Sequence, residues 1–308
     1  MNLLRTATLF ALVFTMASNV VQAELPKVLV SVKPVHSLVA QVMQGIGEPD
    51  LLLSGTVSPH TYAMRPSDSR KLHAADVVFW VGPSLETFLF KALSIIKSDT
   101  QVIALTQQTG INLVKTRSSH LHGHNDETQN VAEHEINPHI WLDPINAKSI
   151  VKIAVSALSE IDPENGLIYR KNGDDAIARL TVLDNELRDL LNPIIRKSYV
   201  VFHDAYQHFE KHYGLNSIAA VTVDAGKTPG AKGIVELKKL IVENKVKCIF
   251  AEPQFEPKII KTITEDSDTE IGTLDSLGAA IDSGPAAYEQ IMRKLADSLL
   301  TCLNGGQK

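Results

Sequence analysis

Several features that assign a chain to common protein classes are missing from this 308-residue sequence. Basic residues are not in excess, because 30 Lys and Arg face 35 Asp and Glu for a formal net charge of −5. This balance argues against nucleic acid as a partner. After the first 23 residues, no apolar run reaches the length that a transmembrane helix needs. We therefore expect a soluble protein that does not bind nucleic acid.

Motifs of the common enzyme classes are also missing. The Gly-Lys-Thr of residues 226–228 resembles the end of a phosphate-binding loop, but Val221 occupies the position of the required first glycine. His134 does not begin a zinc-protease motif, because Pro138 stands where the second histidine would be. No Gly-x-Ser-x-Gly nucleophile elbow occurs. The sequence thus gives no support for catalysis.

The first 23 residues have the pattern of an export signal. Arg5 precedes the apolar run LFALVFTMA, and the segment ends in Val-Gln-Ala, which suits a signal peptidase. We predict a signal peptide over residues 1–23 and a periplasmic location for the mature chain. No cysteine follows the predicted cleavage site, so we expect no lipid anchor.

Cysteine is scarce, with only Cys248 and Cys302 in the whole chain. In an oxidising compartment an even pair of cysteines is expected to form a disulfide. Closing so long a loop would stabilise the fold by about 4 kcal/mol in the chain-entropy model. Two buried free thiols are the alternative.

Short β-rich runs alternate with helical patterns in both halves of the chain, which predicts two similar α/β lobes, each with a parallel sheet. Between the halves, apolar residues recur every three or four positions from Asp162 to Ile195, which predicts one long joining helix. The Asn-Gly pair at 172–173 is its weak point, and the helix could begin after it. The expected domains are an N-terminal lobe over 24–160, the helix over 161–195 and a C-terminal lobe over 196–308.

Candidate metal ligands follow several of the predicted strands. His60 comes after LLLSG, His203 directly follows YVVF, Asp275 follows EIGTL, and His139 lies in the rigid segment NPHIWLDP. Parallel α/β sheets place ligands beyond the carboxyl ends of their strands. Three imidazoles and one carboxylate are the ligand set of a tetrahedral zinc site. A single histidine after a strand is more often an ordinary polar residue, so the hypothesis depends on the coincidence of all four.

A histidine-rich tract over residues 118–135 lies just before His139. It is polar and reads as a loop, and we predict a second, weaker zinc site there, with a plain solvated linker as the alternative. Its candidate ligands are His120, His122, His124 and His134. Four other histidines are interpreted as structural or surface residues, and those at i, i+4 on one helix as incidental: His36, His73, His208 and His212.

Ordered motifs along the mature chain resemble the metal-binding solute-binding proteins of ABC importers, in particular their zinc-specific, ZnuA-like branch. The motifs are SPHTYAMRPSD, NPHIWLDP, YVVFHDAYQHFEKHYGL, TPGAKGIVELKKLI, IFAEPQF and GTLDSLG. The resemblance implies two α/β lobes joined by a backbone helix, with the metal in the cleft between them. It also places the metal ligands at His60, His139, His203 and Asp275, and implies a histidine-rich loop.

One departure from the family pattern affects the fourth ligand. Some zinc members carry a glutamate just before the first histidine, whereas this chain has Pro59. The fourth ligand is then Asp275, a water molecule or a histidine of the tract. We expect at least one of three carboxylates near the ligands to accept a hydrogen bond from an imidazole N–H: Asp143, Asp204 and Glu252.

The sequence therefore predicts a monomeric periplasmic protein, not an enzyme, that captures Zn²⁺ and delivers it to the inner-membrane permease and ATPase of an ABC importer. A histidine at position 203, where manganese-binding branches carry a carboxylate, favours zinc over manganese. The alternative is a secreted zinc hydrolase with water at the fourth coordination position and Asp275 or Glu252 as general base.

Overall fold

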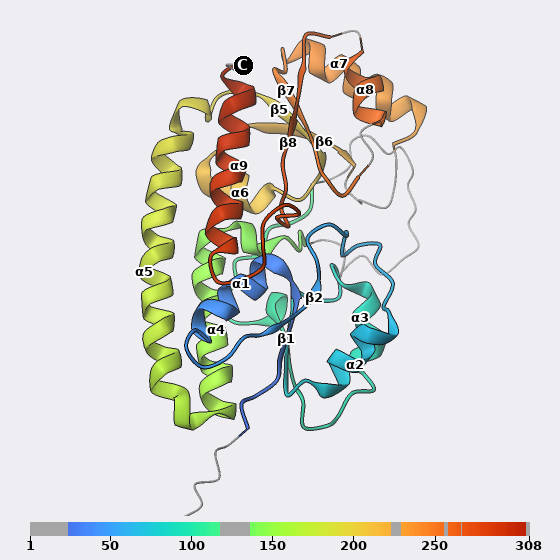
Figure 1. Ribbon diagram of the computed structural model, residues 1–308. Coiled ribbons are helices and arrows are strands. Elements are labelled where there is room, and N and C mark those ends of the chain that lie inside the picture. The colour runs from blue at the N-terminus through green and yellow to red at the C-terminus, as the bar shows by residue number, and fades with distance from the viewer. Residues whose placement is uncertain (1–23, 118–135, 223–228, 256–257, 266, 306–308) are drawn as a thin grey trace, which may run out of the picture.

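The computed structural model describes residues 24–117, 136–222, 229–255, 258–265 and 267–305. Both the predicted signal peptide over residues 1–23 and the histidine-rich tract over residues 118–135 lie outside these described residues. Within them the chain forms two lobes, one above the other in Figure 1, with long helices running along one side of both.

The N-terminal lobe contains a four-stranded parallel sheet. Its strands are β1 (Val28–Val32), β2 (Asp50–Leu53), β3 (Val77–Trp80) and β4 (Gln101–Ala104), in the spatial order β2-β1-β3-β4. Every residue of β1 and β3 is buried. Strands buried on both faces are continuous apolar runs, which is why VLVSV and VVFW were recognisable in the sequence. Around this sheet lie α1 (Lys33–Val42), α2 (Pro66–Ala74) and α3 (Thr87–Leu93).

The C-terminal lobe repeats this topology. Its parallel sheet contains β5 (Tyr199–His203), β6 (Ser217–Thr222), β7 (Cys248–Ala251) and β8 (Glu270–Thr273), in the order β6-β5-β7-β8. The lobe's shorter helices are α6 (Gln207–Tyr213), α7 (Ala231–Glu243) and α8 (Lys258–Thr264). The two lobes are therefore two copies of one parallel arrangement, which confirms the fold class predicted from the sequence.

The joining helix is α5 (Gly166–Leu191), flanked by the short 3-10 helices η3 (Pro163–Asn165) and η4 (Asn192–Ile194). It continues through Asn172 and Gly173, so the later start considered from the sequence is wrong. Gly173 is buried against α4 (Pro144–Ile161), and a Cβ atom there would lie 2.4 Å from the Val155 side chain. The glycine is thus required by close packing of two helices rather than by a turn.

The C-terminal helix α9 (Ala287–Leu303) connects the lobes a second time. It packs against α1 of the N-terminal lobe and against α5. Cys302 near its end forms a disulfide with Cys248 of β7, across 54 residues of sequence, as predicted. This helix shows that the chain after residue 195 is not confined to one lobe; the exact domain boundaries stay a prediction.

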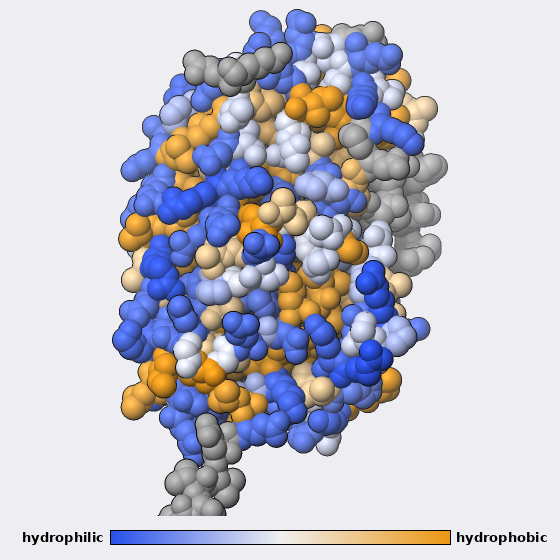
Figure 2. Space-filling model, viewed as in Figure 1, coloured by the Kyte–Doolittle hydropathy of each residue, from blue (hydrophilic) through white to orange (hydrophobic). Residues whose placement is uncertain are grey.

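The surface facing the viewer in Figure 2 is mostly hydrophilic, and orange side chains at its lower left lie over the turn between α4 and α5. Leu167 and Ile168, at the start of α5, are exposed there. Among the described residues, no helix combines the length and apolar character required to cross a bilayer.

Candidate metal centre

Three histidines from distant parts of the sequence meet between the lobes. His60 lies in the segment after β2, His139 immediately precedes the 3-10 helix η2 (Ile140–Leu142), and His203 is the last residue of β5. Their candidate ligand atoms all lie within 4.8 Å of one another. His139 and His203 are each 3% exposed, and His60 is partly exposed. The structure thus brings together the three imidazoles predicted from the sequence.

The pocket around these imidazoles is small. Its walls include Pro59, Glu252 and Phe255 in addition to the three histidines, and the cavity measures ≈ 10 Å³. A volume of this size accommodates about one water molecule or one ion. The centre is therefore suited to a single metal ion.

His139 is held with one defined nitrogen toward the cluster. Its Nδ1 lies 2.9 Å from Asn137 Oδ1. The amide of Asn137 is oriented by its own Nδ2, which donates to the carbonyl oxygen of Asp204 at 2.5 Å. Asn137 Oδ1 is therefore the acceptor, His139 Nδ1 carries the proton, and Nε2 presents its lone pair to the cluster.

Burial lowers the pKa of His139 well below its ordinary value, and the neighbouring His203, His60 and His208 lower it further. The imidazole is consequently neutral near pH 7, which is the form that binds metal. The Nε2 atoms of His60 and His139 are 3.3 Å apart. A cation bound by both atoms would take the place of this direct contact.

His203 is oriented by a carboxylate. Its Nδ1 lies 3.1 Å from Glu252 Oε1 and 3.3 Å from Oε2, and Glu252 is itself buried. On the opposite side of the ring, Nε2 is buried and has no hydrogen-bond partner among the residues that the structure describes. A buried nitrogen without a partner is costly unless a ligand satisfies it. With a metal at Nε2 the pair would form the carboxylate-histidine-metal arrangement common at zinc sites. The contact confirms the expectation that at least one of the three carboxylates accepts from a ligand imidazole.

Asp275 lies nearby but outside the group of three. Its carboxylate accepts hydrogen bonds from the main-chain N–H groups of Leu277, Gly278 and Ala279, and from Gln254 Nε2 at 3.0 Å. Gln254 Nε2 also lies 2.7 Å from the carbonyl oxygen of Gly55 in the other lobe. Asp275 therefore takes part in a link between the lobes, and its predicted role as fourth ligand stays a prediction.

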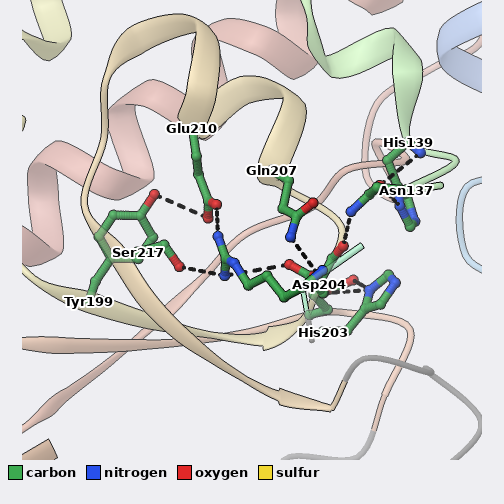
Figure 3. Close-up of polar contacts among 10 residues, drawn as sticks. Asn137, His139, Tyr199, His203, Asp204, Gln207, Glu210 and Ser217 are labelled. Carbon is green, nitrogen blue, oxygen red and sulfur yellow. Dashed lines mark hydrogen bonds and ion pairs between the residues drawn. The ribbon is translucent and has the colours of Figure 1, made fainter. Parts of the chain in front are cut away.

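Asp143 and Asp204 serve other partners. Asp143 caps α4 by accepting from Ile145 N at 2.8 Å, and it lies 3.3 Å from His212 Nδ1. Asp204 belongs to a buried polar cluster in the C-terminal lobe that also contains Gln207 and Glu210 (Figure 3). Neither carboxylate accepts a hydrogen bond from a ligand histidine among the contacts that the structure shows.

The interpretation of His208 and His212 as incidental residues of an exposed helix face is wrong. His208 is 1% exposed, and its Nε2 lies 3.0 Å from the carbonyl oxygen of Asn137. His212 lies between Asp143 and Asp184, with Nε2 2.7 Å from Asp184 Oδ1. His208 therefore connects α6 to the residues just before the ligand His139, and His212 connects α6 to the residues just after it. The four histidines of the tract over residues 118–135 lie outside the described residues.

Removing the carboxylate behind His203 should weaken metal binding without removing a ligand. We expect Glu252→Gln to lower the affinity for Zn²⁺ by about 10–100-fold, the usual effect of losing such a partner. The amide is a weaker acceptor for Nδ1–H and leaves the imidazole less basic. A chelator-competition titration measures the change, and Glu265→Gln, on a distant surface, is the matched control. Equal affinities in the wild type and Glu252→Gln would contradict this role.

Comparison with known proteins places the chain in a family. A family model described as "Zinc-uptake complex component A periplasmic" matches residues 28–302. A protein of Brucella suis biovar 1 named "High-affinity zinc uptake system protein ZnuA" is 38% identical over 305 residues, covering 90% of this chain and 91% of that protein. A protein of the same name from Yersinia pestis is 34% identical over 314 residues, covering 98% and 96%.

Solved structures share the fold. "Crystal structure of ZnuA" superposes with a TM-score of 0.77 at 23% identity, covering 91% of this chain and 100% of that one. The Pseudomonas aeruginosa protein FpvC in complex with Mn²⁺ superposes with a TM-score of 0.78 at 21% identity, covering 91% and 99%. With the family model matched over nearly the whole described chain and the three histidines assembled between two lobes, this chain belongs to the ZnuA family of zinc-uptake solute-binding proteins.

Proposed function

We propose that this protein captures one Zn²⁺ ion in the periplasm, with His60, His139 and His203 as ligands, and delivers it to the membrane permease and ATPase of an ABC importer. Members of the family are transport components and not enzymes, so the hydrolase alternative is set aside. The observation that carries the proposal is the meeting of three imidazoles whose ligand atoms lie within 4.8 Å. The proposed mature chain begins after residue 23, has no lipid anchor and acts as a monomer.

The ligand set supports zinc over harder ions. Three imidazole nitrogens suit Zn²⁺, whereas Mn²⁺ prefers carboxylate and water oxygens and an octahedral shell. Two of the imidazoles are buried on segments fixed by packing: His203 ends a fully buried strand, and His139 precedes the buried side chains of Ile140, Trp141 and Leu142. A compact, rigid set of three nitrogens leaves little room for three further oxygen ligands.

The two-lobe arrangement supplies a route for release. His60 and His139 belong to segments before α4, and His203 belongs to the sheet of the C-terminal lobe. A change in the angle between the lobes would separate His203 from the other two ligands. Because each lost ligand weakens the hold on the ion, docking on a permease that favours the open arrangement would transfer the metal.

A competitive titration of the metal-free protein, residues 24–308, with Zn²⁺ and Mn²⁺ tests this function. We expect one tightly bound Zn²⁺ per chain that excess Mn²⁺ does not displace, because the centre offers three nitrogen ligands. Bound zinc is counted after gel filtration, and affinity is read from a chromophoric chelator. Failure to bind zinc tightly, or displacement by an equal concentration of manganese, would contradict the proposal.

The same titration on two variants addresses the remaining predicted ligands. For the histidine-rich tract, deletion of residues 118–135 should lower the zinc stoichiometry while the tightly bound ion stays; an unchanged stoichiometry would leave the tract as a linker.

For the fourth coordination position we propose Asp275, with water or a histidine of the tract as alternatives. Asp275→Ala should weaken the tight site, and an unchanged affinity would assign the position to one of the alternatives.

A further inference from the structure

Arg117 connects the segment before the ligand His139 to the C-terminal lobe. Its guanidinium contacts the Glu210 carboxylate, lies 3.1 Å from Ser217 Oγ through Nη1, and lies 3.4 Å from Asp204 Oδ1 through the same nitrogen. All three partners belong to the region from β5 to β6. The side chain of Arg117, which comes from the N-terminal half of the chain, therefore contacts three elements of the C-terminal half: the end of β5, helix α6 and strand β6.

The carboxylates that Arg117 binds are deeply buried. The side chains of Asp204 and Glu210 are 1% and 5% exposed. Burial raises the pKa of Glu210 to about 7, and the Arg117 charge opposes that rise. A planar guanidinium can bind two acceptors at once in a fixed geometry, which an ammonium group cannot do. Removing Arg117 would leave two buried carboxylates without their only cation among the contacts shown for the described residues.

Asp204 is fixed from several sides. Beyond the guanidinium, its Oδ2 accepts from Arg117 N at 3.2 Å and from Gln207 Nε2 at 2.9 Å. Its own main-chain N donates to the carbonyl oxygen of Thr222 at 3.1 Å. Asp204 directly follows His203, so the position of this aspartate constrains the main chain that carries a metal ligand.

The carbonyl oxygen of Asp204 is linked to His139, the other buried ligand, by the side chain of Asn137. Asn137 Nδ2 donates to this oxygen at 2.5 Å, and Asn137 Oδ1 lies 2.9 Å from His139 Nδ1 (Figure 3). A continuous set of contacts therefore runs from Arg117 through Asp204 and Asn137 to His139, and along the chain from Asp204 to His203. The cluster joins the supports of two ligands that come from different lobes.

We propose that Arg117 is a positioning residue for the metal centre: by fixing Asp204 it sets the separation of His203 and His139, and with it the affinity and metal preference of the site. This inference rests on the proposed binding of zinc at the three histidines. It assigns to Arg117 a role beyond joining the lobes, because a purely stabilising ion pair would leave the geometry of the bound metal unchanged.

The test compares Arg117→Ala and Arg117→Lys with the wild-type protein, residues 24–308. Arg179→Ala is the matched control, because Arg179 also forms a partly exposed ion pair, with Glu289 on α9, away from the histidines. We expect Arg117→Ala to lower Zn²⁺ affinity by about 10–100-fold, as for other residues that orient ligands. Arg117→Lys should lose less affinity than Arg117→Ala, since lysine keeps the positive charge but not the planar guanidinium that binds two acceptors at once. Arg179→Ala should bind Zn²⁺ as the wild type does.

Cobalt supplies a readout that stability alone would not change. Co²⁺ in a compact tetrahedral site absorbs visible light far more strongly than in an octahedral one, so the spectrum reports the ligand geometry. We expect Arg117→Ala to change the Co²⁺ spectrum and to lower the ratio of the affinity for Zn²⁺ to the affinity for Mn²⁺. The isosteric Asp204→Asn should produce a smaller change in the same direction, and it replaces Arg117→Ala as the deciding variant if that protein does not fold.

Two results would overturn the inference. One is a folded Arg117→Ala protein with wild-type zinc affinity and an unchanged cobalt spectrum. The other, if only Asp204→Asn folds, is the same absence of change in that variant. Either result would leave Arg117 as a structural ion pair. Failure of the wild-type protein to bind zinc would instead overturn the proposed function, so the two failures are distinguishable.

Discussion

Replacing His139 by alanine should lower the affinity of the protein for Zn²⁺ by about 10²–10³-fold. Zinc sites of four protein ligands have binding free energies of about 10–16 kcal/mol, which is about 2.5–4 kcal/mol for each ligand. His139 is the ligand that the surrounding structure prepares most completely, since burial keeps it neutral and Asn137 fixes its ring. Its loss removes a nitrogen that water replaces only weakly.

The control for this substitution is His73→Ala. His73 is an exposed histidine of α2 whose Nδ1 lies 2.7 Å from the carbonyl oxygen of Ser69 within the same helix. We expect this variant to bind zinc as the wild type does, in the same chelator competition. His60→Ala and His203→Ala should resemble His139→Ala. Near-native zinc affinity in all three ligand variants, with their folds intact by circular dichroism, would contradict the assignment.

Loss of the disulfide should cause the largest change in stability. Substituting both Cys248 and Cys302 by alanine opens a loop closed over 54 residues of separation, which costs about 4 kcal/mol in the chain-entropy model. For a chain of this size that is on the order of a 10 °C fall in Tm. The effect reaches both lobes, because the bridge ties α9 to β7 while α9 packs against α1 and α5.

A reducing agent provides the internal control for this second prediction. Reduction should lower the Tm of the wild-type protein toward that of the double variant and leave the double variant unchanged. Both proteins are melted without metal, so that zinc binding does not add to the measured stability. A double variant as stable as the oxidised wild type would show that the packing of α9 alone holds the helix in place.

The strands were predictable from the sequence, whereas two of the long helices were not assigned. Buried parallel strands such as VLVSV are continuous apolar runs bounded by polar residues, and this pattern survives without knowledge of the partners. No element predicted from the sequence corresponds to α4 or α9. Helix α4 packs against both α1 and α5 and buries small residues such as Ala147 and Ala154, so its apolar pattern is broad and weak.

Gly173 shows a limit of local propensity. The intrinsic preference of Asn-Gly argues for a helix boundary, yet α5 continues through it. The reason lies in the neighbouring helix, where the Val155 side chain occupies the space of a Cβ atom. A contact between residues this far apart in sequence leaves no local signal, so tertiary packing overrides the preference.

His60 and His203 were predictable because they follow strands of parallel sheets, and His139 because it lies in the apolar segment NPHIWLDP, but most of their supports were not. Asn137 is the first residue of the NPH motif, and nothing in the sequence indicates that its amide bridges His139 and Asp204. Arg117 lies at the border of a polar tract, where an ion pair with buried Glu210 is not visible. The prediction that at least one of Asp143, Asp204 and Glu252 supports a ligand imidazole is confirmed for Glu252.

X-ray absorption spectroscopy of the zinc-loaded protein tests the central claim most directly. We predict a four-coordinate first shell with three imidazole nitrogens at about 2.0–2.1 Å, visible through the outer-shell scattering of the rings. The same spectrum recorded on His139→Ala should show one imidazole fewer. A shell dominated by oxygen, or an unchanged imidazole count in that variant, would contradict the binding of zinc by His60, His139 and His203.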